Sequence, residues 1–94
     1  MTIAQTILSQ IKTLDRMAMM AWGAKELVNM GDGLKFKTSG MTPWKGYVYV
    51  KYDAGMDLYN IEFFRIRKYE VKVDKQIESV YAEDLVSIID SFVG

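Results

Sequence analysis

Three runs of strand-forming residues follow one another closely in the middle of this chain. They span Tyr47 to Tyr52, Leu58 to Ile66 and Tyr69 to Val73. β-Branched and aromatic residues dominate all three runs, and such residues pack well on the pleated, half-buried surface of a sheet. Because the breaks between the runs are short, the sequence predicts an antiparallel meander on which the remaining chain packs.

A fourth strand is predicted just before this meander, at Leu34 to Lys37. Side chains alternate between the two faces of a strand, so Leu34 and Phe36 are expected to point toward the core. Lys35 and Lys37 are then expected to point outward.

The strand that follows has two faces of different character. Val48 and Val50 share the face that we expect to be buried. Tyr47, Tyr49 and Lys51 share the opposite face, which therefore carries large side chains as well.

The last two strands are expected to turn a second set of residues toward the core: Tyr59, Ile61, Phe63, Tyr69, Val71 and Val73. In the first of these two strands, the pair Phe63-Phe64, followed by Arg65-Ile66-Arg67-Lys68, interrupts the alternation and predicts a bulge or a tight turn.

Helices are predicted on both sides of the strands. Thr2 to Leu14 repeats apolar residues at intervals of three and four, which is typical of an amphipathic helix. Met17 to Met30 carries a second helical stripe, and Asp15 marks either a break between two helices or a point within one long helix. A final helix is predicted from an N-cap at Ser79 to Phe92.

The predicted fold is therefore α+β in a single domain of residues 1–94. It has one or two N-terminal helices, a four-stranded antiparallel meander sheet, and a C-terminal helix, with helices on one sheet face.

Composition excludes several kinds of chemistry. The chain has no cysteine and no histidine, so disulfides, thiolate or histidine metal sites and the usual catalytic triads are excluded. Asp53 and Asp57 flank a turn and offer a weak alternative for a hard cation, but they lack a dense run of oxygen ligands. We expect no enzymatic activity, no cofactor and no metal. No apolar run is long enough to span a membrane, so no membrane interaction is expected.

The charges cancel overall but are unevenly distributed. There are twelve basic and twelve acidic residues, yet residues 34–75 hold nine basic and five acidic ones, a net charge of plus four. Residues 76–94 hold four acidic residues and no basic one. The simplest expectation is that the basic sheet and the acidic last helix attract each other within the fold.

The outer face of the sheet is the best candidate for a functional surface. With the two tryptophans, the candidate binding residues are Trp22, Trp44, Lys35, Lys37, Tyr47, Tyr49, Lys51, Phe64, Arg65 and Arg67. Aromatic residues interleaved with basic ones are typical of single-stranded nucleic-acid platforms, and exposed aromatics and arginines are equally typical of protein interfaces. Trp44, beside Pro43 in the longest loop, is either an anchor under the domain or an exposed contact.

Several short segments resemble a group of short, mostly uncharacterised proteins encoded by bacteriophages. The segments are Ala18-Met19, Gly23-Ala24-Lys25, Leu34 to Lys37, Asp57 to Phe63, Tyr69 to Val73 and Val80 to Leu85. The chain departs from the group at Trp22 and in its longer loop around Pro43-Trp44.

The resemblance implies no established activity and no catalytic residue. It implies an accessory phage protein, a class in which inhibitors of host enzymes or host defence are common. The expected function is therefore binding and inhibition of a bacterial protein in the cytoplasm of an infected host, with single-stranded nucleic-acid binding as the alternative. Assembly into a homo-oligomer is left open.

Overall fold

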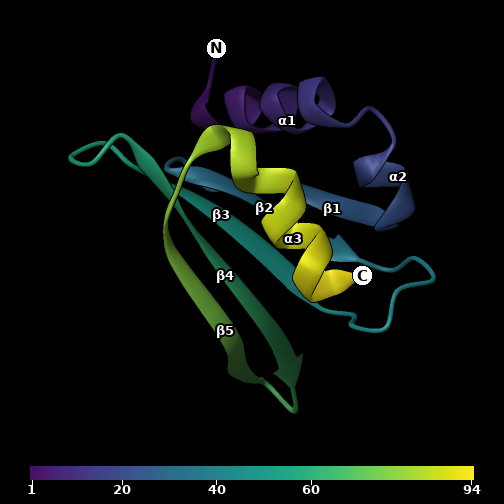
Figure 1. Cartoon of the computed structure of the whole chain (residues 1–94). Coiled ribbons are helices and arrows are strands. Elements are labelled where there is room, and N and C mark those ends of the chain that lie inside the picture. Colours follow the sequence, from purple (N-terminus) through teal and green to yellow (C-terminus); the bar gives the residue numbers. More distant parts are fainter.

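A five-stranded antiparallel sheet forms the body of the fold, and helices cover only one of its faces (Figure 1). The computed structural model describes all residues from Met1 to Gly94. The strands are β1 (Ala24–Asn29), β2 (Gly33–Thr38), β3 (Tyr47–Asp53), β4 (Leu58–Arg67) and β5 (Glu70–Val80). They lie in the order β1-β2-β3-β4-β5, so each strand pairs with its neighbours in the sequence.

The helices come from the two ends of the chain. They are α1 (Ile3–Leu14), the short α2 (Ala18–Ala21), the 3-10 turn η1 (Ala82–Asp84) and α3 (Leu85–Val93). Thr2 caps α1 in a capping box, because its hydroxyl accepts from the Gln5 amide while the Gln5 side chain accepts from the Thr2 amide. In Figure 1, α1 lies along one end of the sheet and α3 crosses its middle.

The core lies between these helices and the sheet. Its fully buried side chains include Ile7, Ile11, Trp22, Phe36, Val48, Val50, Ile61, Phe63, Leu85, Ile89 and Val93. Except for Trp22, which directly follows α2, they come from one face of β2, β3 and β4 and from the inward faces of α1 and α3, as the alternation along the central strands predicts. The α+β fold with an antiparallel sheet and a C-terminal helix is thus confirmed.

The sequence predicted four strands, whereas the structure has five. The additional strand, β1, replaces the second half of the helix that was predicted from Met17 to Met30. Helix α2 ends at Ala21, and Gly23 turns the chain with a positive φ of 62°. A side chain at Gly23 would collide with the backbone of Gly40, so only glycine allows this approach. β1 is an edge strand of mostly exposed residues, and for that reason it lacks the alternation by which buried strands are predicted.

The C-terminal helix also begins later than predicted. Ser79 is not an N-cap: it lies in β5 with a positive φ of 58°, and its amide donates to the Asn60 side chain at 3.0 Å. Here two residues of β5, Glu78 and Ser79, stand opposite the single Asn60, which is a β-bulge. The extra residue interrupts the ladder, and pairing resumes between Val80 and Tyr59 before the chain enters η1.

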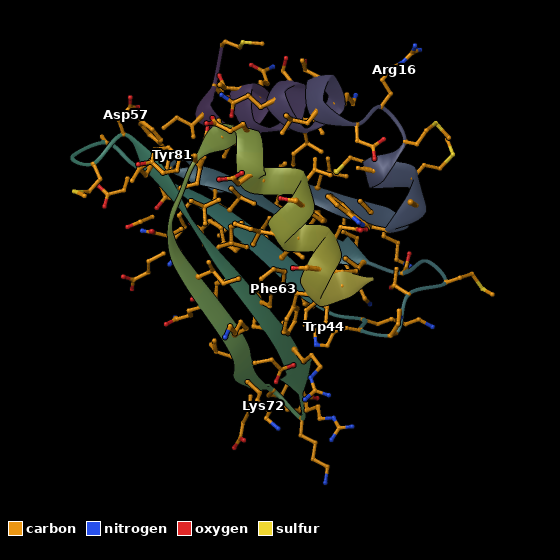
Figure 2. The ribbon with its side chains drawn as sticks, in the orientation of Figure 1. Arg16, Trp44, Asp57, Phe63, Lys72 and Tyr81 are labelled. Carbon is orange, nitrogen blue, oxygen red and sulfur yellow. The ribbon has the colours of Figure 1, made fainter.

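A second bulge lies at the position that Phe63-Phe64 predicted. The register of β4 and β5 shifts there, and Asp74 is the extra residue on β5. Beyond this bulge the β4–β5 hairpin projects past the layer of helices, with Lys72 at its far end (Figures 1 and 2).

Tyr69, Val71 and Val73 were expected to point into the core, and this was wrong. All three side chains are exposed. Val73 pairs with Phe64 and Val71 with Ile66, so both valines lie on the face opposite the helices, and Tyr69 lies in the turn. The alternation itself was real, but the sequence does not say which face of a projecting hairpin is covered.

Candidate functional site

The face of the sheet opposite the helices is uncovered, and we call it the open face. Six of the predicted binding residues lie on it: Lys35, Lys37, Tyr47, Tyr49, Lys51 and Phe64. Arg65 and Arg67 were predicted on the same face, and this was wrong: they alternate with Phe64 and Ile66 along β4 and so lie on its other face. Strand register brings them together, because Tyr47 stands opposite Lys37 on one side and Phe64 on the other. The predicted assignment of Val48 and Val50 to the buried face and Tyr49 and Lys51 to the other is confirmed.

Tyr47 is the centre of the most closely packed part of this face. Its ring stacks on that of Phe64, with ring centroids 5.3 Å apart and planes at 13°. The ammonium groups of Lys35 and Lys37 lie 5.5 and 5.8 Å from the centroid of the Tyr47 ring, within the range of cation–π attraction. The Tyr47 ring is therefore already engaged by one aromatic neighbour and two cations.

Tyr49 is engaged in a similar way. Its hydroxyl donates a hydrogen bond to the carboxylate of Asp32, and Lys51 Nζ lies 4.8 Å from its ring centroid. Partial burial of the hydroxyl, the hydrogen bond to Asp32 and the negative charges of Asp32 and Glu62 together raise the pKa of Tyr49 to about 12. Two carboxylates thus influence the middle of the open face.

Trp22 is not on any binding surface. It is 1% exposed, its ring stacks on Phe36 with planes at 2°, and its indole nitrogen donates to Asp90 at 3.1 Å. The hydrogen bond satisfies the one polar group of a side chain that otherwise belongs to the core.

Trp44 is an anchor rather than an exposed contact. Its ring packs edge-on against Phe63 and Phe92, with centroids 5.8 and 5.1 Å away. In Figure 2 it lies beneath the C-terminal end of α3, next to Phe63. Trp44 therefore packs the loop that precedes β3 against the helical layer.

Asp74 joins Trp44 to Arg65. Its carboxylate accepts from the Trp44 indole at 2.9 Å and from Arg65 Nη2 at 3.2 Å, and Arg65 Nε lies 2.6 Å away as an ionic contact that is not aligned as a hydrogen bond. The hydrogen bonds from Arg65 and Trp44, in that order, lower the pKa of Asp74. Asp74 is the extra residue of the bulge in β5, and bulges commonly redirect a side chain in this way.

A basic hollow lies at the end of the sheet where the loop enters β3. Its volume is about 480 Å³, and it is lined by Lys37, Lys45, Gly46, Tyr47, Arg65, Ile66 and Arg67. We call it the basic pocket. It has four cationic side chains and no acidic one, and it gathers Lys37, Tyr47, Arg65 and Arg67 from the predicted set. Lys45 was not predicted, although its place beside Trp44 in the loop was a usable signal.

An apolar patch continues from the basic pocket. Ile66 lines the pocket and is followed on the open face by Val71 and Val73, beside the nearly buried Phe64. We call Ile66, Val71 and Val73 the apolar strip. Sequence reasoning missed it because these residues alternate like core residues.

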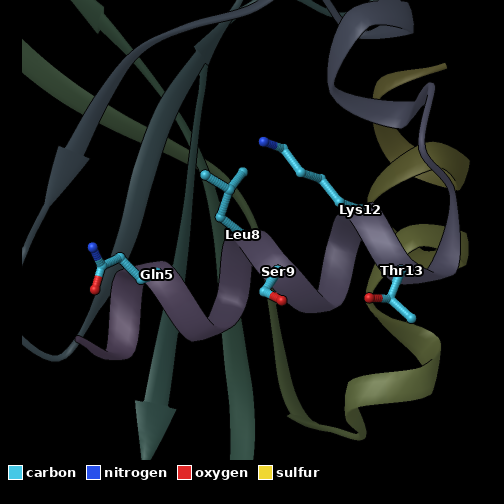
Figure 3. Close-up of a pocket in the computed structure, with 5 residues that line it drawn as sticks. All are labelled: Gln5, Leu8, Ser9, Lys12 and Thr13. Carbon is cyan, nitrogen blue, oxygen red and sulfur yellow. The ribbon is translucent and has the colours of Figure 1, made fainter. Parts of the chain in front are cut away.

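The remaining hollows offer less chemistry. One of about 370 Å³ runs along the outer side of α1, lined by Gln5, Leu8, Ser9, Lys12 and Thr13 (Figure 3). Its side chains form neither a charge cluster nor an apolar floor. No group of three or more acidic side chains is arranged so that it could hold a metal ion.

Comparisons with protein-family models, with curated proteins and with solved structures found no match to this chain. No helix in the structure combines the length and the apolar character needed to cross a bilayer.

Proposed function

We propose that this protein is a small non-enzymatic binding protein that docks a bacterial protein on the open face of its sheet. The observation that carries the proposal is the apolar strip, which leaves Ile66, Val71 and Val73 exposed beside clustered tyrosines and basic residues. Contiguous exposed apolar side chains rimmed by polar ones are typical of protein interfaces. Together with the resemblance to phage proteins, this supports an accessory phage protein that inhibits a host or defence protein in the bacterial cytoplasm.

Single-stranded nucleic acid is the second candidate, and the basic pocket is the feature that favours it. Four cations around one hollow could contact phosphates. The tyrosines fit this function less well, since a stacking platform needs free rings. The Tyr47 ring is taken up by Phe64, Lys35 and Lys37, and the carboxylates of Asp32 and Glu62 near Tyr49 would repel a passing phosphate backbone.

A pull-down from bacterial lysate, with and without nuclease, tests the proposal when it is done with two matched variants. Val73→Lys places a charge in the apolar strip, and Leu14→Lys makes the same kind of change at an equally exposed site on α1; the two side chains are 44% and 43% exposed. We expect a nuclease-resistant protein partner that Leu14→Lys retains and Val73→Lys loses. Equal retention by both variants would show that the open face is not the docking surface.

Binding of an oligothymidylate tests the alternative directly. If the open face binds nucleic acid, Tyr49→Ala should weaken binding by about 1–3 kcal/mol through lost stacking. Lys51→Ala should reduce the salt dependence by about one phosphate contact. If the surface binds a protein, substitutions on it should weaken the protein complex with little change in its salt dependence.

A further inference from the structure

The basic pocket has cations that the fold leaves without partners. The pair between Arg65 and Asp74 is the only ion pair in the structure, so Lys37, Lys45 and Arg67 have no carboxylate within ion-pair distance. The acidic residues of η1 and α3, which were expected to attract the basic sheet, do not pair with it. Folding thus collects four cations in one hollow and pairs only one of them, Arg65, with a carboxylate.

The guanidinium of Arg65, which lines this pocket, is held in one orientation. Asp74 holds the guanidinium by two contacts, and Trp44 holds Asp74 in turn. A guanidinium that is already oriented loses less freedom when an anion approaches its remaining donors. The other three cations have no carboxylate partner, and Lys37 lies over the Tyr47 ring.

The size and the surroundings of the pocket limit which anion fits. Its volume of about 480 Å³ admits a few side chains or one small ligand. Asp32 and Glu62 lie beside Tyr49 on the open face, among Lys35 and Lys51, and their carboxylates oppose a long phosphate backbone that crosses the sheet there. Ile66 lines the pocket and leads into the apolar strip, which suits the apolar side chains of a peptide.

From these features we infer that the basic pocket is a receptor for an acidic segment of a partner protein, whose carboxylates sit among Lys37, Lys45, Arg65 and Arg67. This inference rests on the proposed function and gives the partner a chemistry: an extended run of Asp or Glu residues with apolar residues beside it.

A nuclear magnetic resonance titration of the intact chain with an acetylated hexaglutamate peptide tests the inference. At low salt we expect saturable shifts concentrated at the amides of Lys45, Gly46 and residues 65–67. Arg67→Glu should weaken the affinity fivefold or more, because one pair is lost and a repulsion replaces it. Lys12→Glu makes the same charge change on α1, outside the pocket, and should leave the affinity within twofold.

Four outcomes would overturn the inference. The first is the absence of saturable shifts. The second is an equal loss of affinity in both variants, which would show that only the net charge matters. The third is tighter binding of a hexathymidylate at the same amides, which would identify the pocket as a nucleic-acid site. The fourth is concentration-dependent self-association in sedimentation that Arg67→Glu abolishes, which would make a second copy of the chain the occupant.

Hexaglutamate needs no partner protein, so the inference and the proposed function fail separately. If hexaglutamate does not bind but Val73→Lys still abolishes capture of the partner, the inference that the partner presents an acidic segment is wrong. The proposal that the open face docks the partner is then still supported. If hexaglutamate binds at the pocket but Val73→Lys does not reduce capture of the partner, the inference of an acidic-segment site is supported and the proposal that the open face docks the partner is wrong.

Discussion

At the scale of single residues, the tightest turn of the molecule uses residues that are poorly suited to it. Lys68 and Tyr69 connect β4 to β5 with positive φ values of 47° and 68°. A two-residue hairpin with both residues in this region prefers Asn-Gly, because side chains with a Cβ are strained there. The Tyr69 side chain is fully exposed and packs on nothing that would offset this strain.

Tyr69→Gly is therefore expected to stabilise the protein. Relief of the left-handed conformation should raise the free energy of unfolding by about 1 kcal/mol. Tyr81→Gly serves as the control, since Tyr81 is also exposed but has an ordinary φ of −75°, and glycine there should lower the same quantity by about 0.5–1 kcal/mol. Urea denaturation of both variants measures the difference, and a loss of stability in both would mean that the turn is unstrained.

At the scale of elements, three segments meet at Asp74. This residue belongs to β5, its ion-pair partner Arg65 belongs to β4, and Trp44 belongs to the loop before β3. Trp44 in turn contacts Phe92 of α3. The bulge residue thus links the base of the projecting hairpin to the helical layer.

Asp74→Asn should change how stability depends on pH. The folded-state pKa of Asp74 lies below its ordinary value of 3.8, so the carboxylate stabilises the fold fully above about pH 4, and this contribution is lost as the pH falls through the folded-state pKa. We expect the variant to be less stable at pH 7 and to lose less stability between pH 5 and pH 2.

The comparison requires urea midpoints at several pH values and a control acid. Glu83→Gln removes a carboxylate that makes no ion pair or side-chain hydrogen bond, and it should retain the acid response of the parent protein. An unchanged response in Asp74→Asn would show that its contacts with Arg65 and Trp44 contribute nothing measurable in solution.

At the scale of the whole molecule, the two sheet faces have different roles. One face is buried beneath α1 and α3 and holds the core, whereas the other has no covering layer (Figure 1). β4 contributes isoleucines to both faces: Ile61 is 1% exposed and Ile66 is 49% exposed.

This asymmetry predicts opposite outcomes for the same substitution on one strand. Ile61→Ala should lower the free energy of unfolding by about 2–5 kcal/mol through lost burial and a residual cavity. Ile66→Ala should change it by less than about 0.5 kcal/mol and should weaken partner capture instead. A large loss of stability in Ile66→Ala would indicate that a second copy of the chain covers the open face in solution.

The central strands and the amphipathic helices were predictable from local pattern. Val48, Val50, Ile61 and Phe63 point into the core as their alternation predicts, and α1 begins and ends close to its expected bounds. These segments are buried on one side only, so the period of their apolar residues reports both the element and its buried face.

The candidate site was predictable in part. Lys35, Lys37, Tyr47, Tyr49 and Lys51 share the open face because they alternate with core residues on adjacent strands. The apolar strip and Lys45 were not found, since their grouping depends on how far the β4–β5 hairpin extends past α3 and on where the loop folds back.

By itself, then, the sequence determined the antiparallel meander, the α1 and α3 helices, and the lack of cysteine and histidine chemistry. Only the tertiary structure decided that residues 24–29 form an edge strand, that Val71 and Val73 face solvent, and that four cations meet at one pocket. The physical reason is the range of the interactions: periodicity and propensity act over a few neighbouring residues, whereas coverage of a sheet face and convergence of charges depend on segments far apart in the chain.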